Sequence, residues 1–292
     1  GAVVLKSIFE EQINEETSGV FKAGYGMGDA YPEAEDYIKA YIRSNTIQKY
    51  VELVRNAKSR LTIPVIASVN CFSGGEWVSF ARQLEEAGAD ALELNVFILP
   101  VNEFKESAEV ENVYFEIVKS IKSQIKIPVS VKISHYFTNL SAFVDKIKAY
   151  GANATTLFNR FYEPDININT LEMGAASVFS TAAELRTTLR WTGILAGKDK
   201  RLEISASTGV HGGEATVKLL LAGATTVQVC SVLYEKGIHV IEDINNFIGK
   251  WMDSKAFKTI EDYRGMLSYS SIENPDLYER AQFMKYFSNK QY

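Results

Sequence analysis

The chain has 292 residues, of which 46% are hydrophobic, and a formal net charge of −5 at pH 7. This length allows one barrel-sized domain or two smaller ones, each with a substantial core. The acidic balance gives no support to binding of nucleic acid or of an anionic membrane surface. The longest apolar stretch, residues 219–233, is interrupted by glycine, threonine and glutamine and is too short to span a bilayer.

The two cysteines, Cys71 and Cys230, lie in apolar contexts typical of strands. We expect both to be buried, reduced thiols of a cytoplasmic protein and not parts of a disulfide framework. No group of cysteine and histidine residues has the spacing of a metal site. The sequence therefore predicts no metal.

A short pattern recurs along the chain, in which a helix end is followed by Gly-Ala and then by an apolar strand. Copies occupy residues 87–92, 150–154 and 222–227, and residues 1–5 have the form of the second half of a fourth. A strand and a helix would precede that half copy. We therefore expect that an N-terminal βα unit is missing from this chain.

Seven apolar segments have the length and composition of strands, and amphipathic helices separate most of them. The expected strands are Ala2–Lys6, Pro64–Val69, Ala91–Val96, Pro128–Ile133, Ala154–Phe158, Leu202–Ala206 and Thr225–Cys230. The expected helices are Ile47–Ala57, Glu76–Ala87, Val110–Ser123, Leu140–Tyr150, Thr181–Ala196 and Glu214–Ala222, the last with Gly223 as its C-cap. The strands are nearly continuously apolar, as in parallel sheets buried on both faces.

With the missing unit, the strand count predicts an α/β fold, the (β/α)8 TIM barrel. We expect this barrel in residues 1–269 and a tail, residues 270–292, packed on it. Two connections, residues 7–44 and 159–180, exceed the usual loop length. Both follow the C-terminal end of a strand, where a barrel builds its pocket and lid.

Polar residues follow the expected strands at the end where a barrel has its active site. They are Lys6-Ser7, Asn70, Glu93 with Asn95, Lys132, Asn159, Ser207–Gly209 and Cys230-Ser231. A lysine here must be paired or face an anion if it does not reach solvent. An asparagine at such a position hydrogen-bonds either to the backbone of a turn or to the edge of a planar ring. We expect Glu93 to take part in hydrogen bonding between strands and not in chemistry.

The last two strands run into small residues that precede helices, at Ser207–Gly209 with Gly212-Gly213 and at Cys230-Ser231. Backbone N–H groups in such turns bind phosphate, and the loops after strands 7 and 8 are the usual phosphate site of a barrel. The alternative is that the glycines only close tight turns.

Together these motifs resemble the dihydroorotate dehydrogenases, FMN-dependent barrel enzymes of pyrimidine biosynthesis. The resemblance extends from residue 1 to about Tyr269 and rests on Lys6-Ser7, Glu93-Leu94-Asn95, Val131-Lys132-Ile133, Thr208-Gly209-Val210 and Gln228-Val229-Cys230-Ser231. It implies hydride transfer from dihydroorotate, or a related small ring compound, to FMN in a homodimer.

The resemblance also implies the roles of individual residues. It places Lys6, Asn95 and Asn159 at the substrate. It places Lys6, Ser7, Lys132, Asn159, Thr208, Gly209, Cys230 and Ser231 at FMN. A cation at Lys132 would stabilise negative charge on the reduced ring.

One departure from the family concerns the catalytic base, for which the family uses cysteine or serine. Here that position falls on Ile98, which cannot accept a proton. If the chain is active, the acceptor is Cys71, Glu103 or a water, and Asn102 is a candidate for the displaced asparagine of this loop.

Two alternatives to the dehydrogenase remain. One is a flavin-binding paralogue with little or no dihydroorotate activity. The other is a flavin-free lyase that binds a phosphorylated substrate and forms a Schiff base on Lys6 or Lys132.

Overall fold

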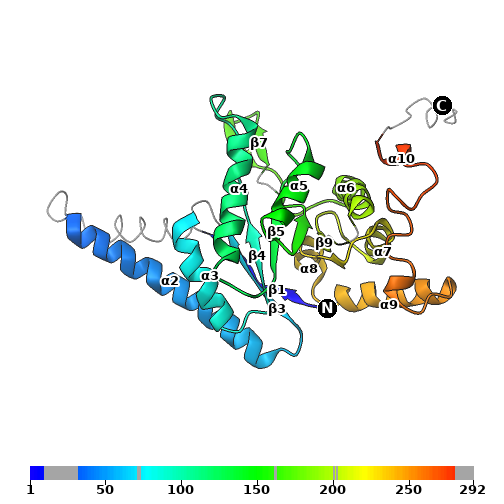
Figure 1. Cartoon of the computed structure of the whole chain (residues 1–292), viewed down its shortest axis with the longest axis horizontal. Coiled ribbons are helices and arrows are strands. Elements are labelled where there is room, and N and C mark those ends of the chain that lie inside the picture. Colours follow the sequence, from blue (N-terminus) through cyan, green and yellow to red (C-terminus); the bar gives the residue numbers. More distant parts are fainter. Residues whose placement is uncertain (10–31, 71–73, 161–162, 200, 202, 280–292) are drawn as a thin grey trace. The chain divides into compact units, whose positions relative to one another are not determined.

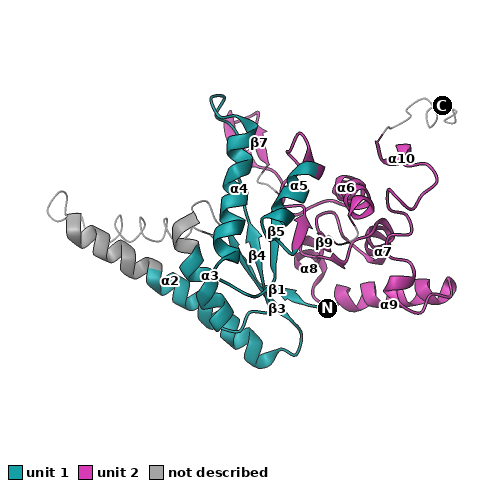
Figure 2. Cartoon of the chain, viewed as in Figure 1, with its two compact units in different colours: residues 1–133, 142–153 teal, residues 134–141, 154–292 magenta. Residues whose placement is uncertain are grey.

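The structure is a computed structural model that describes residues 1–9, 32–70, 74–160, 163–199, 201 and 203–279. It divides into two compact units (Figure 2). Unit 1 comprises residues 1–133 and 142–153, and unit 2 comprises residues 134–141 and 154–292. Cys71 and residues 280–292 of the expected tail lie outside the described residues.

Unit 1 is a parallel sheet with helices in the connections (Figure 1). Its strands are β1 (Val3–Val4), β2 (Ile8–Phe9), β3 (Val65–Asn70), β4 (Ala91–Asn95) and β5 (Val129–Ile133). Both β1 and β2 pair with β3, which pairs with β4, and β4 pairs with β5. The helices are α2 (Pro32–Arg60), α3 (Gly74–Glu86), α4 (Ser107–Lys122) and most of α5 (Leu140–Ala149).

The sheet of unit 1 has one apolar face and one polar face, because side chains alternate along each strand. The apolar face is buried to 2% exposure or less and consists of Val65, Ala67, Val69, Leu92, Leu94, Val129, Val131 and Ile133. The polar face carries Ser68, Asn70, Glu93, Asn95, Ser130 and Lys132, of which the first four are also buried. Thus the strands are largely buried on both sides as expected, and the second side is mainly polar, with Ile66 and Ala91 near the N-terminal ends of β3 and β4.

An ion pair fixes the N-terminal ends of the strands in unit 1. Lys58 Nζ, near the end of α2, lies 2.7 and 2.9 Å from the two carboxylate oxygens of Asp90. The same carboxylate accepts a hydrogen bond of 2.7 Å from the backbone N–H of Val65, the first residue of β3. The hydrogen bond from Lys58 lowers the pKa of Asp90. This end of the sheet therefore serves stability, as is typical of barrel proteins.

Unit 2 contains three parallel strands, a separate hairpin and several helices. In the parallel sheet, β9 (Glu203–Ala206) lies between β6 (Ala154–Leu157) and β10 (Thr226–Val227). The antiparallel hairpin consists of β7 (Pro164–Asn167) and β8 (Glu172–Ala175). The helical segments are η1 (Ala182–Glu184), α6 (Leu185–Lys198), α7 (Gly213–Ala222), α8 (Ser231–Lys236), α9 (Val240–Ser254), η2 (Ile260–Asp262) and α10 (Asp276–Glu279).

Helix α7 ends at Gly223, as its sequence predicts. This residue has φ of +115°, and its N–H donates to the carbonyls of Leu219 and Leu220. A Cβ here would lie 2.5 Å from that of Ala196, on α6. Glycine is therefore required both by the left-handed backbone and by the close approach of the helices.

The α/β class and the alternation of parallel strands with helices, as in a (β/α)8 barrel, are confirmed. Several boundaries differ. Within the first expected strand, Ala2–Lys6, only Val3–Val4 forms a strand (β1), and the last expected strand reaches only Val227. The expected loop 7–44 is wrong at two places. It contains β2, and α2 starts within it at Pro32, a residue that is well tolerated in the first turn of a helix. The long connection 159–180 contains the hairpin β7–β8.

Cys230 is exposed, so the expectation of a buried thiol is wrong for this residue. Cys230 lies beyond the end of β10 at Val227 and directly precedes α8, so it is not part of the buried sheet. The division at residue 269 stays a prediction, although Tyr278 of α10 packs against Gly193 of α6. Among the helices of the described ranges, none combines the length and hydropathy needed to cross a membrane.

Candidate active site

Unit 1 brings two of the predicted site residues side by side. In the strand register Asn70 pairs with Asn95, and Asn95 pairs with Lys132. All three belong to the polar face and lie at or near the C-terminal ends of their strands. Asn70 and Asn95 are 4% and 6% exposed. Two amides and an ammonium group therefore line adjacent strands at the end where barrel enzymes carry their active sites.

Lys132 is paired with Glu93 on the neighbouring strand. Its Nζ lies 3.7 Å from Glu93 Oε1, and the two side chains are 20% and 3% exposed. Glu93 is two residues from Asn95 and therefore lies on the same face of β4. Glu93 therefore contacts the neighbouring strand through an ion pair, and its expected hydrogen bonding between strands stays a prediction.

Lys6 and Ser7 follow β1 in the same unit. Ser7 Oγ lies 2.7 Å from Ser68 Oγ, which links it to the polar face of β3. The hydroxyl of Tyr50 on α2 donates to the carbonyl of Ser68 (2.8 Å) and fixes the backbone there. Burial raises the pKa of Tyr50 to about 12. Lys6 is exposed.

The loop that contains the base position is anchored at Ile98. The backbone of Ile98 hydrogen-bonds to Tyr114, whose pKa is raised to about 12 by burial. Ile98 itself is half-buried, whereas Glu103 is exposed. The side chain of Asn102 accepts a hydrogen bond of 3.0 Å from the N–H of Phe104 and so closes a local turn.

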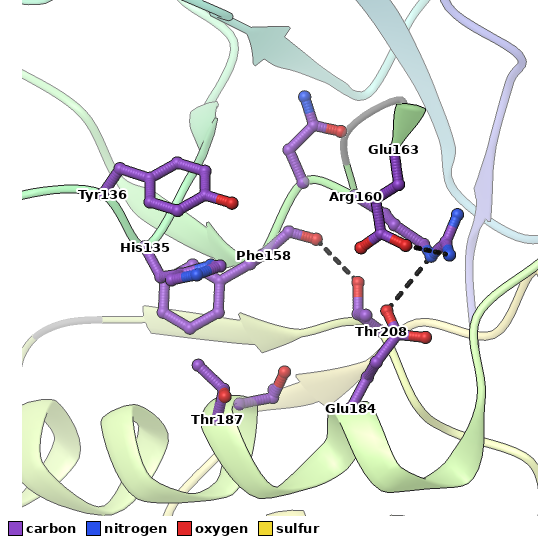
Figure 3. Close-up of a pocket in the computed structure, with 10 residues that line it drawn as sticks. His135, Tyr136, Phe158, Arg160, Glu163, Glu184, Thr187 and Thr208 are labelled. Atoms are coloured by element: carbon purple, nitrogen blue, oxygen red, sulfur yellow. Dashed lines mark hydrogen bonds and ion pairs between the residues drawn. The ribbon is translucent and has the colours of Figure 1, made fainter. Parts of the chain in front are cut away.

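Unit 2 contains a pocket that includes Asn159 and Thr208 (Figure 3). Its volume is about 130 Å³, below the roughly 300–1,000 Å³ of typical ligand pockets. It is lined by His135, Tyr136, Phe158, Asn159, Arg160, Glu163, Glu184, Thr187, Thr188 and Thr208. Partial burial lowers the pKa of His135, so this imidazole is neutral at pH 7.

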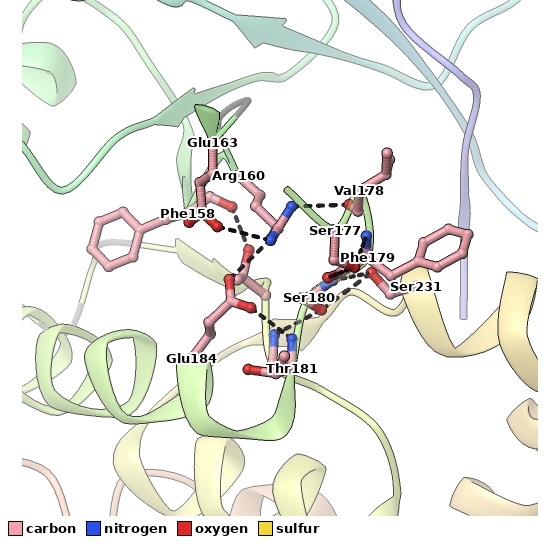
Figure 4. Close-up of polar contacts among 12 residues, drawn as sticks. Phe158, Arg160, Glu163, Ser177, Val178, Phe179, Ser180, Thr181, Glu184 and Ser231 are labelled. Atoms are coloured by element: carbon pink, nitrogen blue, oxygen red, sulfur yellow. Dashed lines mark hydrogen bonds and ion pairs between the residues drawn. The ribbon is translucent and has the colours of Figure 1, made fainter. Parts of the chain in front are cut away.

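Arg160 ties together the segments around this pocket (Figure 4). Its Nε lies 3.1 Å from Glu184 at the start of α6, and its Nη2 lies 3.2 Å from Glu163. Its Nη1 donates to the carbonyl of Val178 (3.0 Å). The guanidinium is 17% exposed. Because Arg160 follows Asn159 directly, these contacts fix the backbone beside a predicted substrate residue.

The predicted phosphate turn in unit 2 has a left-handed backbone at Thr208 and Gly209, with φ of +79° and +77°. A Cβ at Gly209 would lie 2.2 Å from the backbone N of Leu185, so only glycine fits. Threonine is strained in this conformation, and the hydrogen bond from its hydroxyl to the carbonyl of Phe158 (3.0 Å) offsets part of the cost.

Two residues that the sequence reasoning did not single out contact this turn. Ser180 Oγ lies 3.4 Å from the N–H of Gly209 and 3.1 Å from Ser231 Oγ. It also lies 3.3 Å from His211 Nε2. A histidine directly before Gly212-Gly213 was a readable signal, but Ser180 could be found only from the fold because it lies far from the turn in sequence.

The predicted site residues therefore form two groups. Ser7, Asn95 and Lys132, together with the exposed Lys6, belong to unit 1, and Asn159, Thr208, Gly209, Cys230 and Ser231 belong to unit 2. Within the described part of the chain, there is no cluster of side chains suited to a metal ion.

Comparison with known proteins connects this geometry to a family. Residues 42–252 match the family model of dihydroorotate dehydrogenase. A dihydroorotate dehydrogenase B (NAD(+)) catalytic subunit from Thermoplasma acidophilum is 30% identical over 91% of this chain and 86% of its own length. Proteins of the same name from Thermoplasma volcanium and Pyrococcus furiosus are each 27% identical, over 83% and 72% of this chain and 83% and 70% of their own lengths. The chain therefore belongs to the dihydroorotate dehydrogenase family, a family of flavoprotein oxidoreductases.

Proposed function

We propose that this chain is an FMN-dependent dehydrogenase that oxidises dihydroorotate, or a closely related ring compound, by hydride transfer to the flavin. The observation that carries the proposal is the alignment of Asn95 with Lys132 on the polar face of unit 1, next to the buried carboxylate of Glu93. This arrangement places amides that can hydrogen-bond to a planar ring beside a cation, near the C-terminal end of a parallel sheet.

The residues present fit FMN in two respects. Asn70 Oδ1 is buried and has no hydrogen-bond partner among the described residues. Such an acceptor suits a ring N–H, because a buried polar atom without a partner is costly. Gly212, the N-cap of α7 just after the turn, has no heavy atom of the described residues within 4 Å of where a Cβ would lie, which leaves the backbone there open to a ligand. FMN, when bound, supplies the hydride acceptor.

The residues of the chain would divide the remaining tasks. Asn95 and Asn159 orient the substrate ring through their amides, with Lys6 beside it. Lys132 presents a positive charge to the edge of the flavin, where negative charge develops. Ser7, held by Ser68, positions the chain after β1 against the cofactor. Thr208, Gly209, Cys230 and Ser231 hold the phosphate.

The proton that leaves the substrate carbon must be taken by a group other than Ile98. Glu103 lies on the same loop and is exposed, while Cys71 falls outside the described residues. Ile98 is also what a flavin-binding protein with little catalysis would carry, and this is the second candidate function.

The ion pair of Lys132 disfavours a flavin-free lyase that would use this residue, one of the two lysines considered with Lys6, as its Schiff base. A Schiff-base lysine attacks the substrate through its side-chain nitrogen, whereas Nζ of Lys132 faces the Glu93 carboxylate 3.7 Å away. Borohydride trapping of a substrate on lysine would reverse this preference.

The visible absorbance spectrum of the purified chain tests the proposal. We expect a flavin spectrum, followed by bleaching when dihydroorotate is added anaerobically. A flavin spectrum without bleaching favours the binding protein, and a colourless protein that takes up no FMN contradicts the proposal.

A further inference from the structure

One histidine of unit 2, His135, lines the same pocket as the predicted substrate residue Asn159 (Figure 3). It follows the C-terminal end of β5 by two residues. Its ring packs against two aromatic rings, with centroid distances of 4.3 Å to Tyr136 and 5.7 Å to Phe158. The backbone beside it is fixed as well, because the N–H of Tyr136 donates to the hydroxyl of the buried Ser134 (3.2 Å). The imidazole is therefore held at the edge of the pocket.

The ring nitrogens of His135 are available to a ligand. Among the residues that the structure describes, none forms a hydrogen bond or an ion pair with either nitrogen. In His211, by contrast, Nε2 lies 3.3 Å from Ser180 Oγ and Nδ1 lies 3.6 Å from Glu235 Oε2. Burial lowers the pKa of His135, so that one of its nitrogens carries a lone pair at pH 7. A neutral imidazole of this kind can accept a proton.

The carboxylates of the same pocket are already engaged. Besides His135, the titratable side chains that line it are Tyr136, Arg160, Glu163 and Glu184. The carboxylates of Glu163 and Glu184 lie 3.2 and 3.1 Å from nitrogens of the Arg160 guanidinium. Two carboxylates and one guanidinium leave one negative charge in excess, which stabilises an imidazolium once His135 has taken up a proton. In Figure 3, His135 lies on the opposite side of the pocket from Arg160 and Glu163.

We infer that His135 is the general base of this chain and takes the proton from C5 of the substrate ring, a task that Ile98 cannot perform. This inference rests on the proposed function. In the step, the C5–H bond breaks and a nitrogen of His135 takes the proton. The electron pair of that bond forms the C5–C6 double bond as a hydride leaves C6 for the flavin. His135 keeps contact with solvent, so the proton can then pass to water.

The neighbours of His135 support this role. A base must lie within hydrogen-bond reach of the proton that it removes, and His135 shares its pocket with Asn159, which we propose to orient the ring. It also follows Lys132, the lysine that we propose to face the flavin, by three residues at the end of the same strand. Lys132 is itself paired with Glu93. The alternative is that His135 only packs against Tyr136 and Phe158.

The test follows the anaerobic reduction of the flavin by dihydroorotate in a stopped-flow instrument, over about pH 5 to pH 8, where histidines titrate. For wild type, the rate should fall as pH drops through the pKa of His135, which burial places below its ordinary value of about 6.5. His135→Gln should slow reduction at pH 7 by about a hundredfold and remove this dependence on pH. His135→Phe, which keeps a ring beside Phe158, should do the same.

Proton NMR gives a readout that does not depend on turnover. The Cε1–H signal of His135 is assigned by its loss in His135→Gln. In wild type, this signal should shift when the product orotate is added, whereas the signal of the exposed His239 should not. A histidine that served only in packing away from the ring would not report the binding of orotate.

The matched control is His239→Gln, which should change neither the rate nor its dependence on pH. If His135→Gln does not fold by circular dichroism, His135→Phe decides the outcome. Slower reduction with the wild-type pH profile, or a His135 signal that orotate does not move, overturns the inference alone. A wild-type chain whose bound flavin is not reduced by dihydroorotate at any pH overturns the proposed function and the inference together.

Discussion

Lys132 and Glu93 form an ion pair across strands β5 and β4, with 3.7 Å between Nζ and Oε1. The carboxylate is almost fully buried, whereas the ammonium group keeps some exposure. Glu93 therefore holds Lys132 in place at the edge of the polar face and offsets part of its charge. Both effects would act on the flavin that we propose beside Lys132, because its ring gains negative charge on reduction.

We expect Lys132→Gln to make the flavin harder to reduce. Loss of the cation should move the two-electron potential to more negative values by roughly 30 mV or more, equivalent to about 1.4 kcal/mol. The measurement is a spectroscopic redox titration. Lys126→Gln, an exposed lysine ahead of the same strand, is the control. An unchanged potential in Lys132→Gln would remove Lys132 from the flavin site.

We expect Glu93→Gln to move the potential in the opposite direction. The amide keeps the size of the side chain and removes the negative charge that offsets Lys132, so the reduced flavin is better stabilised. The same titration measures it. A shift to more negative values would mean that Glu93 acts by positioning Lys132 and not through its charge.

We expect Ile98→Cys to create or raise dihydroorotate-dependent reduction of the flavin. The hydrogen bond between Tyr114 and the backbone of Ile98 fixes the loop, so a thiol should take the place of the present side chain. Stopped-flow bleaching of the flavin measures the rate. Ile98→Ala is the control, because it makes the side chain smaller without adding a group that can accept a proton. No response in Ile98→Cys would show that the pocket differs from the family in more than this residue.

The parallel strands were predictable from sequence because each is a short apolar run bounded by turn residues, and Gly223 marked a helix end. The polar face was readable only in part. Lys132 and Asn95 stand out as polar residues at strand ends. That they lie side by side follows only from the pairing of β4 with β5, which the sequence does not give. Apart from Glu163, the partners of Arg160 and Ser180 lie 18 to 51 residues away. No local pattern encodes such contacts, and the exposure of Cys230 likewise depends on where β10 stops.

We expect Asp90→Asn to lower stability at pH 7 without affecting flavin binding, since Asp90 lies at the opposite end of the strands from Lys132. The pKa of Asp90 is lowered in the folded state by Lys58 and the N–H of Val65. Its contribution is therefore complete above the unfolded value of about 3.9 and is lost as pH falls through the lower folded value.

The size of this effect is limited because the Asp90 side chain is 40% exposed. Solvent screening reduces the contribution to about 1 kcal/mol or less. Urea unfolding at pH 7 and at pH 2 measures it. The difference between wild type and Asp90→Asn should shrink at the lower pH, and a difference that stays constant would assign the effect to packing and not to charge.

We expect Arg160→Lys to destabilise unit 2 by roughly 2 kcal/mol. The guanidinium bonds Glu184, Glu163 and the carbonyl of Val178 from three different nitrogens, and one ammonium group cannot reach all three. Because Asn159 precedes Arg160, looser anchoring should also raise the KM for dihydroorotate more than it lowers kcat. Arg190→Lys, an exposed arginine on α6, is the control. Urea unfolding and steady-state kinetics measure both effects, and a loss of stability with unchanged KM would limit Arg160 to a structural role.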